Sequence, residues 1–80
     1  MREYIATFHT HLSALLTSRS LTELGIRAQM MPVPRKLSSS CGTCVHYFSD
    51  SPNIEAMDAD VEGVYEKTDR DEYVLLITNA

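Results

Sequence analysis

One long helix-forming stretch stands among several short strand-like segments, and this combination most constrains how the chain can fold. Thr10 is a typical helix N-cap residue, and Gly25 followed by Ile26 is typical of a helix end. The leucines between them predict an amphipathic helix with a buried leucine stripe: Leu12, Leu15, Leu16, Leu21 and Leu24. Serines and threonines weaken the middle of this helix, so packing against a sheet must stabilise it.

Segments rich in β-branched and aromatic residues predict the strands. They cover residues 4–8, 27–31, 43–48, 61–66 and 73–78. A short helix is expected from Pro52 to about Ala59, because proline suits the first position of a helix. This order predicts an α+β fold of the ferredoxin-like split βαβ type, with a shortened second helix and an added C-terminal strand. Part of the sheet would stay open, which favours a homodimer.

Size and charge exclude several functions. The chain of 80 residues, 44% of them hydrophobic, predicts a single domain over residues 1–80 that is too small for a large substrate pocket. Its net charge of −4 argues against general nucleic-acid binding, which depends on Lys and Arg. No apolar run approaches the roughly 18 residues of a membrane span, and the first apolar stretch is too brief for a signal sequence. We therefore expect a cytoplasmic protein that uses no membrane.

Positive charge is concentrated in the part of the chain that holds the cysteines. Residues 1–48 contain five basic and two acidic residues, whereas residues 49–80 contain two basic and nine acidic residues. Two solvated faces of different sign would explain this distribution. A positive field around the cysteines is the alternative interpretation.

Two cysteines in the spacing CxxC are the one local pattern with chemical content. Cys41 and Cys44 flank Gly42 and Thr43. The reactive form of cysteine is the thiolate, and a free cysteine is mostly protonated at neutral pH. Cationic side chains would stabilise the thiolate, and Arg35 and Lys36 precede the pair. Gly42 has no side chain, so the backbone can bend there and a second molecule's sulfur can approach Cys41.

Residues near the cysteines suggest further contacts. Alternation along residues 43–48 places Thr43, Val45 and Tyr47 on one face of the strand and Cys44, His46 and Phe48 on the other. His46 could therefore pair with the Cys44 thiol. Backbone N–H groups around Ser40 and Gly42 could donate to the Cys41 sulfur.

The residues alone leave several roles open for the two thiols. In a cytoplasmic chain they indicate redox, metal or transfer chemistry more than a structural disulfide. They could also be inert, half-buried small residues. A zinc site would need His9 or His11 beside Cys41, Cys44 and His46. A thioredoxin-type CxxC begins a helix, whereas this one begins a strand.

A resemblance to a known family rests on residues 32–42, Pro-Val-Pro-Arg-Lys-Leu-Ser-Ser-Ser-Cys-Gly. This stretch resembles the motif of the small bacterial domain family called selenium/sulfur carrier protein-like, whose members have a similar run ending in serine-cysteine-glycine. The family's motif positions fall here on Pro34, Arg35, Ser40, Cys41 and Gly42. Cys44 stands where the family often has a small apolar residue, so the resemblance implies no role for it.

The resemblance implies a carrier that receives sulfane sulfur, or its selenium equivalent, as a persulfide on Cys41. The implied partner is a cysteine desulfurase or a sulfurtransferase-like protein, and no cofactor is implied. On this hypothesis Arg35 lowers the pKa of Cys41 and Gly42 makes room for the partner. Cys44 could resolve the persulfide by forming a disulfide with Cys41. The alternatives are a non-catalytic accessory domain and a small metal-binding module; whether the chain is an enzyme stays open.

Overall fold

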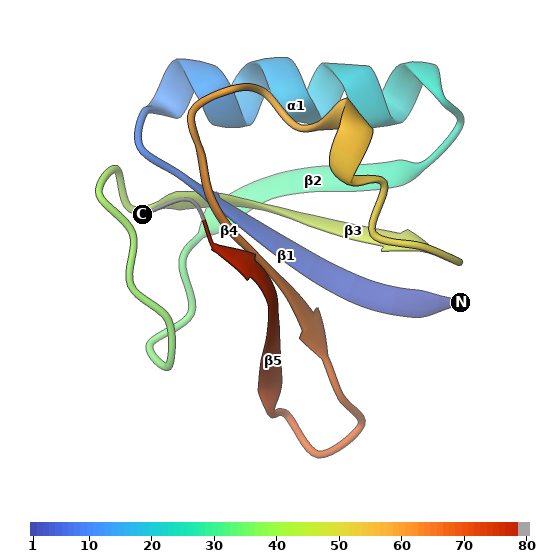
Figure 1. Ribbon diagram of the computed structural model, residues 1–80, viewed down its shortest axis with the longest axis vertical. Helices are drawn as coiled ribbons and strands as arrows, with labels where there is room; N and C mark the ends of the chain where they lie inside the picture. Colours follow the sequence, from blue (N-terminus) through green and yellow to red (C-terminus); the bar gives the residue numbers. More distant parts are fainter. Residues whose placement is uncertain (79–80) are drawn as a thin grey trace.

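The computed structural model describes residues 1–78, which form one antiparallel sheet with a helix across one face (Figure 1). The strands lie in the order β2-β3-β1-β4-β5. The α+β class is confirmed. The elements are β1 (Arg2–Phe8), α1 (His11–Glu23), β2 (Arg27–Pro32), β3 (Thr43–Ser49), the 3₁₀ turn η1 (Ile54–Ala56), β4 (Val61–Lys67) and β5 (Tyr73–Thr78). Within residues 1–78, no helix has the length and apolar character needed to cross a membrane.

The ends of α1 form as the sequence predicts. The Thr10 side chain accepts a hydrogen bond from the Ser13 N–H at 3.1 Å and caps the N-terminus. At the other end, Gly25 adopts a φ of +80°, which glycine tolerates without strain. The Ile26 N–H then donates to the Leu21 carbonyl at 3.0 Å and satisfies one of the last carbonyls of the helix.

The expected burial of the leucine stripe is confirmed for Leu21, which is fully buried, whereas Leu15 is half-buried and the other three leucines are exposed. Leu12 and Leu24 are 61% and 59% exposed, and Leu16 is exposed as well. The buried side chains of α1 are Ser13, Ala14, Thr17 and Leu21. Three of these four side chains are small, and Leu21 is the one leucine of α1 in the buried core.

The expected short helix from Pro52 to about Ala59 is also wrong, because only η1 forms there. Asn53 adopts a left-handed φ of 51°, and the backbone becomes extended again at Met57. Asp58 then bonds to α1: its N–H donates to Thr17 Oγ1 at 2.9 Å, and its carboxylate accepts from Ser13 Oγ at 2.7 Å. The missing second helix leaves the ferredoxin-like assignment a prediction.

The sheet buries residues on both faces. Tyr4, Phe8 and Tyr47 belong to the core beneath α1, where the rings of Tyr4 and Tyr47 stack with centroids 5.3 Å apart. Ile5 and Cys44 are also buried, but they point to the opposite face. The predicted alternation along residues 43–48 is therefore confirmed.

Candidate functional site

The segment from 33 to 42 is a loop that leaves β2 and returns to β3. Its ends are joined by a hydrogen bond from the Val33 N–H to the Gly42 carbonyl at 3.1 Å. Gly42 has a φ of +75°, and nothing lies within 4 Å of the position a Cβ would occupy. Backbone conformation therefore requires glycine at this position, directly after Cys41.

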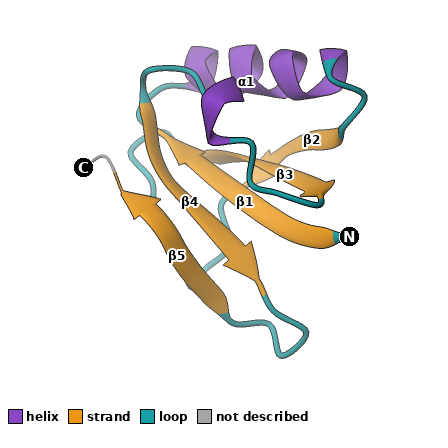
Figure 2. Ribbon diagram, turned by 45° about the vertical axis from the view of Figure 1, so that its right-hand side comes forward, coloured by secondary structure: helices purple, strands orange, loops and turns teal. Residues whose placement is uncertain are grey.

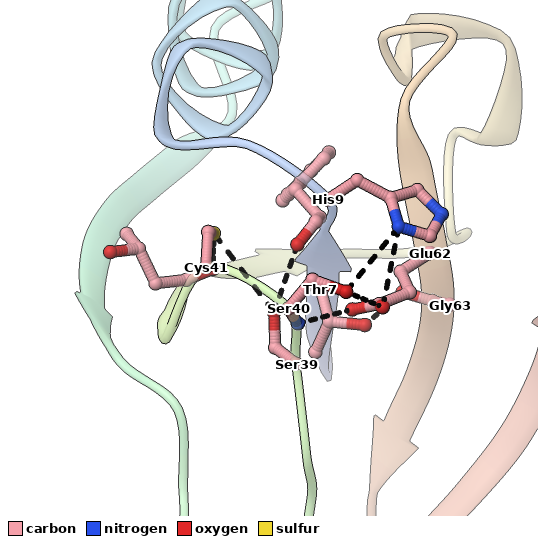
Figure 3. A network of polar contacts seen from close by, with 9 residues as sticks. Thr7, His9, Ser39, Ser40, Cys41, Glu62 and Gly63 are labelled. Atoms are coloured by element: carbon pink, nitrogen blue, oxygen red, sulfur yellow. Dashed lines mark hydrogen bonds and ion pairs between the residues drawn. The ribbon is translucent and has the colours of Figure 1, made fainter. Parts of the chain in front are cut away.

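Ser40 is held to β4 by both of its donors (Figure 3). Its N–H donates to Glu62 Oε1 at 3.2 Å, and its hydroxyl donates to Glu62 Oε2 at 2.7 Å. His9, which directly follows β1, places Nδ1 3.4 Å from Glu62 Oε2 and 3.5 Å from Ser40 Oγ. We call this group of Ser40, Glu62 and His9 the Ser40 clamp. It fixes the backbone immediately before Cys41.

Ser39 makes a second attachment, to β1. Its hydroxyl donates to the Phe8 carbonyl at 2.9 Å and lies 4.0 Å from Cys41 Sγ. The Cys41 thiol donates to the Thr43 carbonyl at 3.4 Å. Cys41 is half-buried and packs in part against the core beneath α1. Cys41 is therefore partly exposed as a residue, and its sulfur lies close to two polar atoms, Ser39 Oγ and the Thr43 carbonyl oxygen.

Cys44 lies in a different environment. Its side chain is fully buried on the face opposite α1, and its thiol donates to the Pro32 carbonyl at 3.7 Å. Burial, with the Cys41 thiol as a smaller cause, raises the pKa of Cys44 to about 11. Despite their spacing, the two cysteines do not form a CxxC pair, because strand alternation turns Cys44 away from the core against which Cys41 packs. Burial keeps the Cys44 thiol protonated near neutral pH. Its role in resolving a Cys41 persulfide stays a prediction.

Two other expected contacts are replaced. His46 hydrogen-bonds to the Glu3 carboxylate and its ring meets Phe48 edge-on, whereas the Cys44 thiol donates to the Pro32 carbonyl. The N–H of Ser40 binds Glu62, so it is not available to the Cys41 sulfur.

Arg35 lies exposed in the turn of the loop, and within residues 1–78 it makes no ion pair. Its effect on Cys41 stays a prediction. The same described part of the chain contains no group of three or more His, Cys, Asp or Glu side chains placed to hold a metal ion.

Sequence reasoning missed the contribution of Glu62 to the site. The contact between Ser40 and Glu62 joins residues 22 positions apart, so no local sequence pattern predicts it. The sequence offered His9 as a possible zinc ligand, whereas in the structure it is exposed and lies beside Glu62 and Ser40. The run of three serines before Cys41 was the only local signal, because serine hydroxyls frequently bond to nearby backbone and carboxylate groups.

The Ser40 clamp predicts an effect of Glu62 on the loop. Burial raises the pKa of Glu62, but the hydrogen bonds from Ser40, together with the charge of His9, outweigh this and lower it overall. The ionised carboxylate therefore adds stability above the ordinary glutamate pKa of about 4.3, and this is lost as pH falls through the lower folded value. Glu62→Gln should cost about 1 kcal/mol of unfolding free energy at neutral pH and accelerate hydrogen exchange at the Ser40 amide.

Glu66→Gln is the matched control on the same strand, because Glu66 lies 4.0 Å from the exposed Arg2 and is not part of the Ser40 clamp. It should leave Ser40 exchange unchanged. Equal exchange at Ser40 in the two variants would show that the clamp does not hold the loop.

Comparison with known proteins gives one line of evidence on ancestry. Residues 3–67 match the model of the family described as "Putative Se/S carrier protein-like". This range contains the loop, both cysteines and the Ser40 clamp, and it ends with the last residue of β4. No curated protein and no solved structure matches the chain.

Proposed function

The chain belongs to the putative Se/S carrier protein-like family, whose model covers well over half of it, and from this premise we propose that it carries sulfur or selenium on Cys41. The carried form is a persulfide, or the corresponding selenium species. The element would come from a cysteine desulfurase or a sulfurtransferase-like protein in the cytoplasm.

The contrast between the two thiols supports Cys41 as the carrier. Cys41 is half-buried at the end of a surface loop, whereas Cys44 is sealed in the sheet with a raised pKa. A carrier thiol must become a thiolate and meet the sulfur of another protein. The partial exposure of Cys41 supports it in this role, and the complete burial of Cys44 argues against Cys44.

The proposed transfer is a thiolate exchange. The Cys41 thiolate attacks the outer sulfur of a persulfide on the donor, the S–S bond of the donor breaks, and the donor cysteine leaves as a thiolate. The outer sulfur keeps its hydrogen and becomes the terminal atom of the Cys41 persulfide. Nothing is oxidised or reduced overall, so the step needs no further co-reactant.

In this proposal the loop holds Cys41 in place for transfer. The Ser40 clamp and the Ser39 bond to Phe8 hold the backbone on the N-terminal side of Cys41. Gly42 leaves open space on the other side. Arg35, on the same loop, would favour the thiolate when the loop meets its partner.

Sulfur loading tests the proposal directly. Reduced protein is incubated with a cysteine desulfurase and cysteine, and intact mass spectrometry measures the product. We expect a gain of one sulfur atom that a reductant removes. Cys41→Ser should abolish the gain, and the matched control Cys44→Ser should retain it.

Other results would overturn the assignment. No adduct on the wild-type chain would favour a non-catalytic accessory domain, an alternative that the packing of Cys41 against the core supports. An adduct that survives in Cys41→Ser would place the carried sulfur elsewhere. Circular dichroism of both variants checks that each is folded.

A further inference from the structure

β5 forms one of the two outer edges of the sheet (Figure 2). β5 pairs with β4 on one side, and within residues 1–78 no strand pairs with its other side. Residues 73–78 read Tyr-Val-Leu-Leu-Ile-Thr and contain no charge, proline or glycine. Val74 and Leu75 are each 50% exposed, and Leu76 is 38% exposed. Such an edge offers unpaired backbone N–H and C=O groups together with apolar side chains.

The opposite edge of the sheet, and the edge that β4 would form without β5, carry residues that hinder the addition of another strand. β2, at the opposite side of the sheet, carries Arg27 and ends in Pro32. Charge and proline are the usual means of preventing strands from adding to an edge. β4 would be the edge without β5, and it carries three charged residues, Glu62, Glu66 and Lys67. β5 lies outside the family match and replaces this charged edge with an uncharged one.

We propose that β5 pairs antiparallel with β5 of a second copy of this chain, forming a two-fold dimer with a continuous ten-stranded sheet. The register within the sheet supports one alignment. Val74 and Ile77 pair with β4 residues of the helix-side face, so both point to that face. A two-fold axis between Leu75 and Leu76 places Val74 opposite Ile77 of the second copy, with both side chains on one face. The irregular pairing near Leu76 then falls at the axis in both copies.

Charge favours a second copy in the antiparallel direction. The turn before β5 reads Asp69, Arg70, Asp71, Glu72, which is net acidic. Antiparallel pairing sets the two turns at opposite ends of a six-residue strand, about 20 Å apart and beyond the Debye length of about 8 Å. Parallel pairing would bring the two acidic turns together. The strand itself has no charged side chain that would select a different protein.

Measurement of mass against concentration tests this dimer. Six residues a side is well below the roughly 20–30 of a standard interface, so we expect a dimer that dissociates near micromolar concentration. Sedimentation velocity of the reduced chain should show dimer at high concentration and monomer on dilution. Leu75→Lys should raise the dissociation constant at least tenfold. Leu24→Lys is the matched control, since this leucine directly follows α1 and is 59% exposed, and this variant should dimerise as the wild type does.

Hydrogen exchange locates the interface independently of any variant. The amides of β5 should exchange more slowly in the concentrated sample than in the dilute one, with the amides of β2 unchanged. Cys41→Ser should still dimerise, which separates this interface from a disulfide and from the carrier role. A monomer at every concentration, a dimer that survives Leu75→Lys, or growth beyond the dimer would each overturn the proposal.

Discussion

Phe8→Ala is expected to lower the free energy of unfolding by about 3–5 kcal/mol. The Phe8 ring is completely buried in the core beneath α1. A chain of this length has a total stability of about 4–12 kcal/mol, so this one change removes a large part of it. Chemical denaturation followed by circular dichroism measures the loss.

Leu24→Ala provides the comparison for the core substitution. Its side chain is 59% exposed, and its removal should change the unfolding free energy by less than about 0.5 kcal/mol. A loss below about 1 kcal/mol in Phe8→Ala would mean that the end of β1 is not packed as described. Phe8 also bears the carbonyl that accepts the Ser39 hydroxyl, so its displacement should loosen the loop before Cys41.

The two cysteines are expected to differ by at least about 100-fold in their rate of alkylation in the native protein. The pKa of Cys44 is raised to about 11, against about 8.5 for a free cysteine, so its thiolate fraction near neutral pH falls by about two orders of magnitude. Complete burial slows it further, because the reagent must wait for local opening. Cys41 is only half-buried and is spared this barrier.

Peptide mass spectrometry after timed labelling with iodoacetamide separates the two sites. In denaturant the rates should become equal, which is the internal control. Below about pH 11 the labelling of Cys44 should rise about tenfold per pH unit. Equal native rates at neutral pH would contradict the separation of the two thiols on which the carrier assignment depends.

The same raised pKa predicts how Cys44 affects stability. A neutral buried thiol contributes stability that is present below the pKa of the unfolded cysteine and is lost as pH rises towards about 11. Cys44→Ala should therefore flatten the alkaline part of the stability profile.

The sequence by itself determined the features that depend on neighbouring residues. Thr10 caps the helix and Gly25 ends it through bonds that span only a few positions. Pro32 ends its strand, and alternation along residues 43–48 separates the two faces, since both follow from backbone geometry. The serine-cysteine-glycine motif was likewise local, and it sufficed to indicate the family.

Contacts between residues far apart in the sequence determined how α1 packs, which residues surround Cys41, and how the two cysteines differ. Ser13, on the buried face of α1, donates to Asp58 45 positions away, and no helical periodicity contains that contact. Glu62 reaches Ser40 only because β4 lies beside β1 in the sheet. The spacing of Cys41 and Cys44 suggested a dithiol, whereas packing left Cys41 half-buried against the core beneath α1 and Cys44 fully buried in the sheet. Local chemistry selects the elements, but only the assembled sheet determines which side chains meet, because that depends on the free energy of the whole packed arrangement.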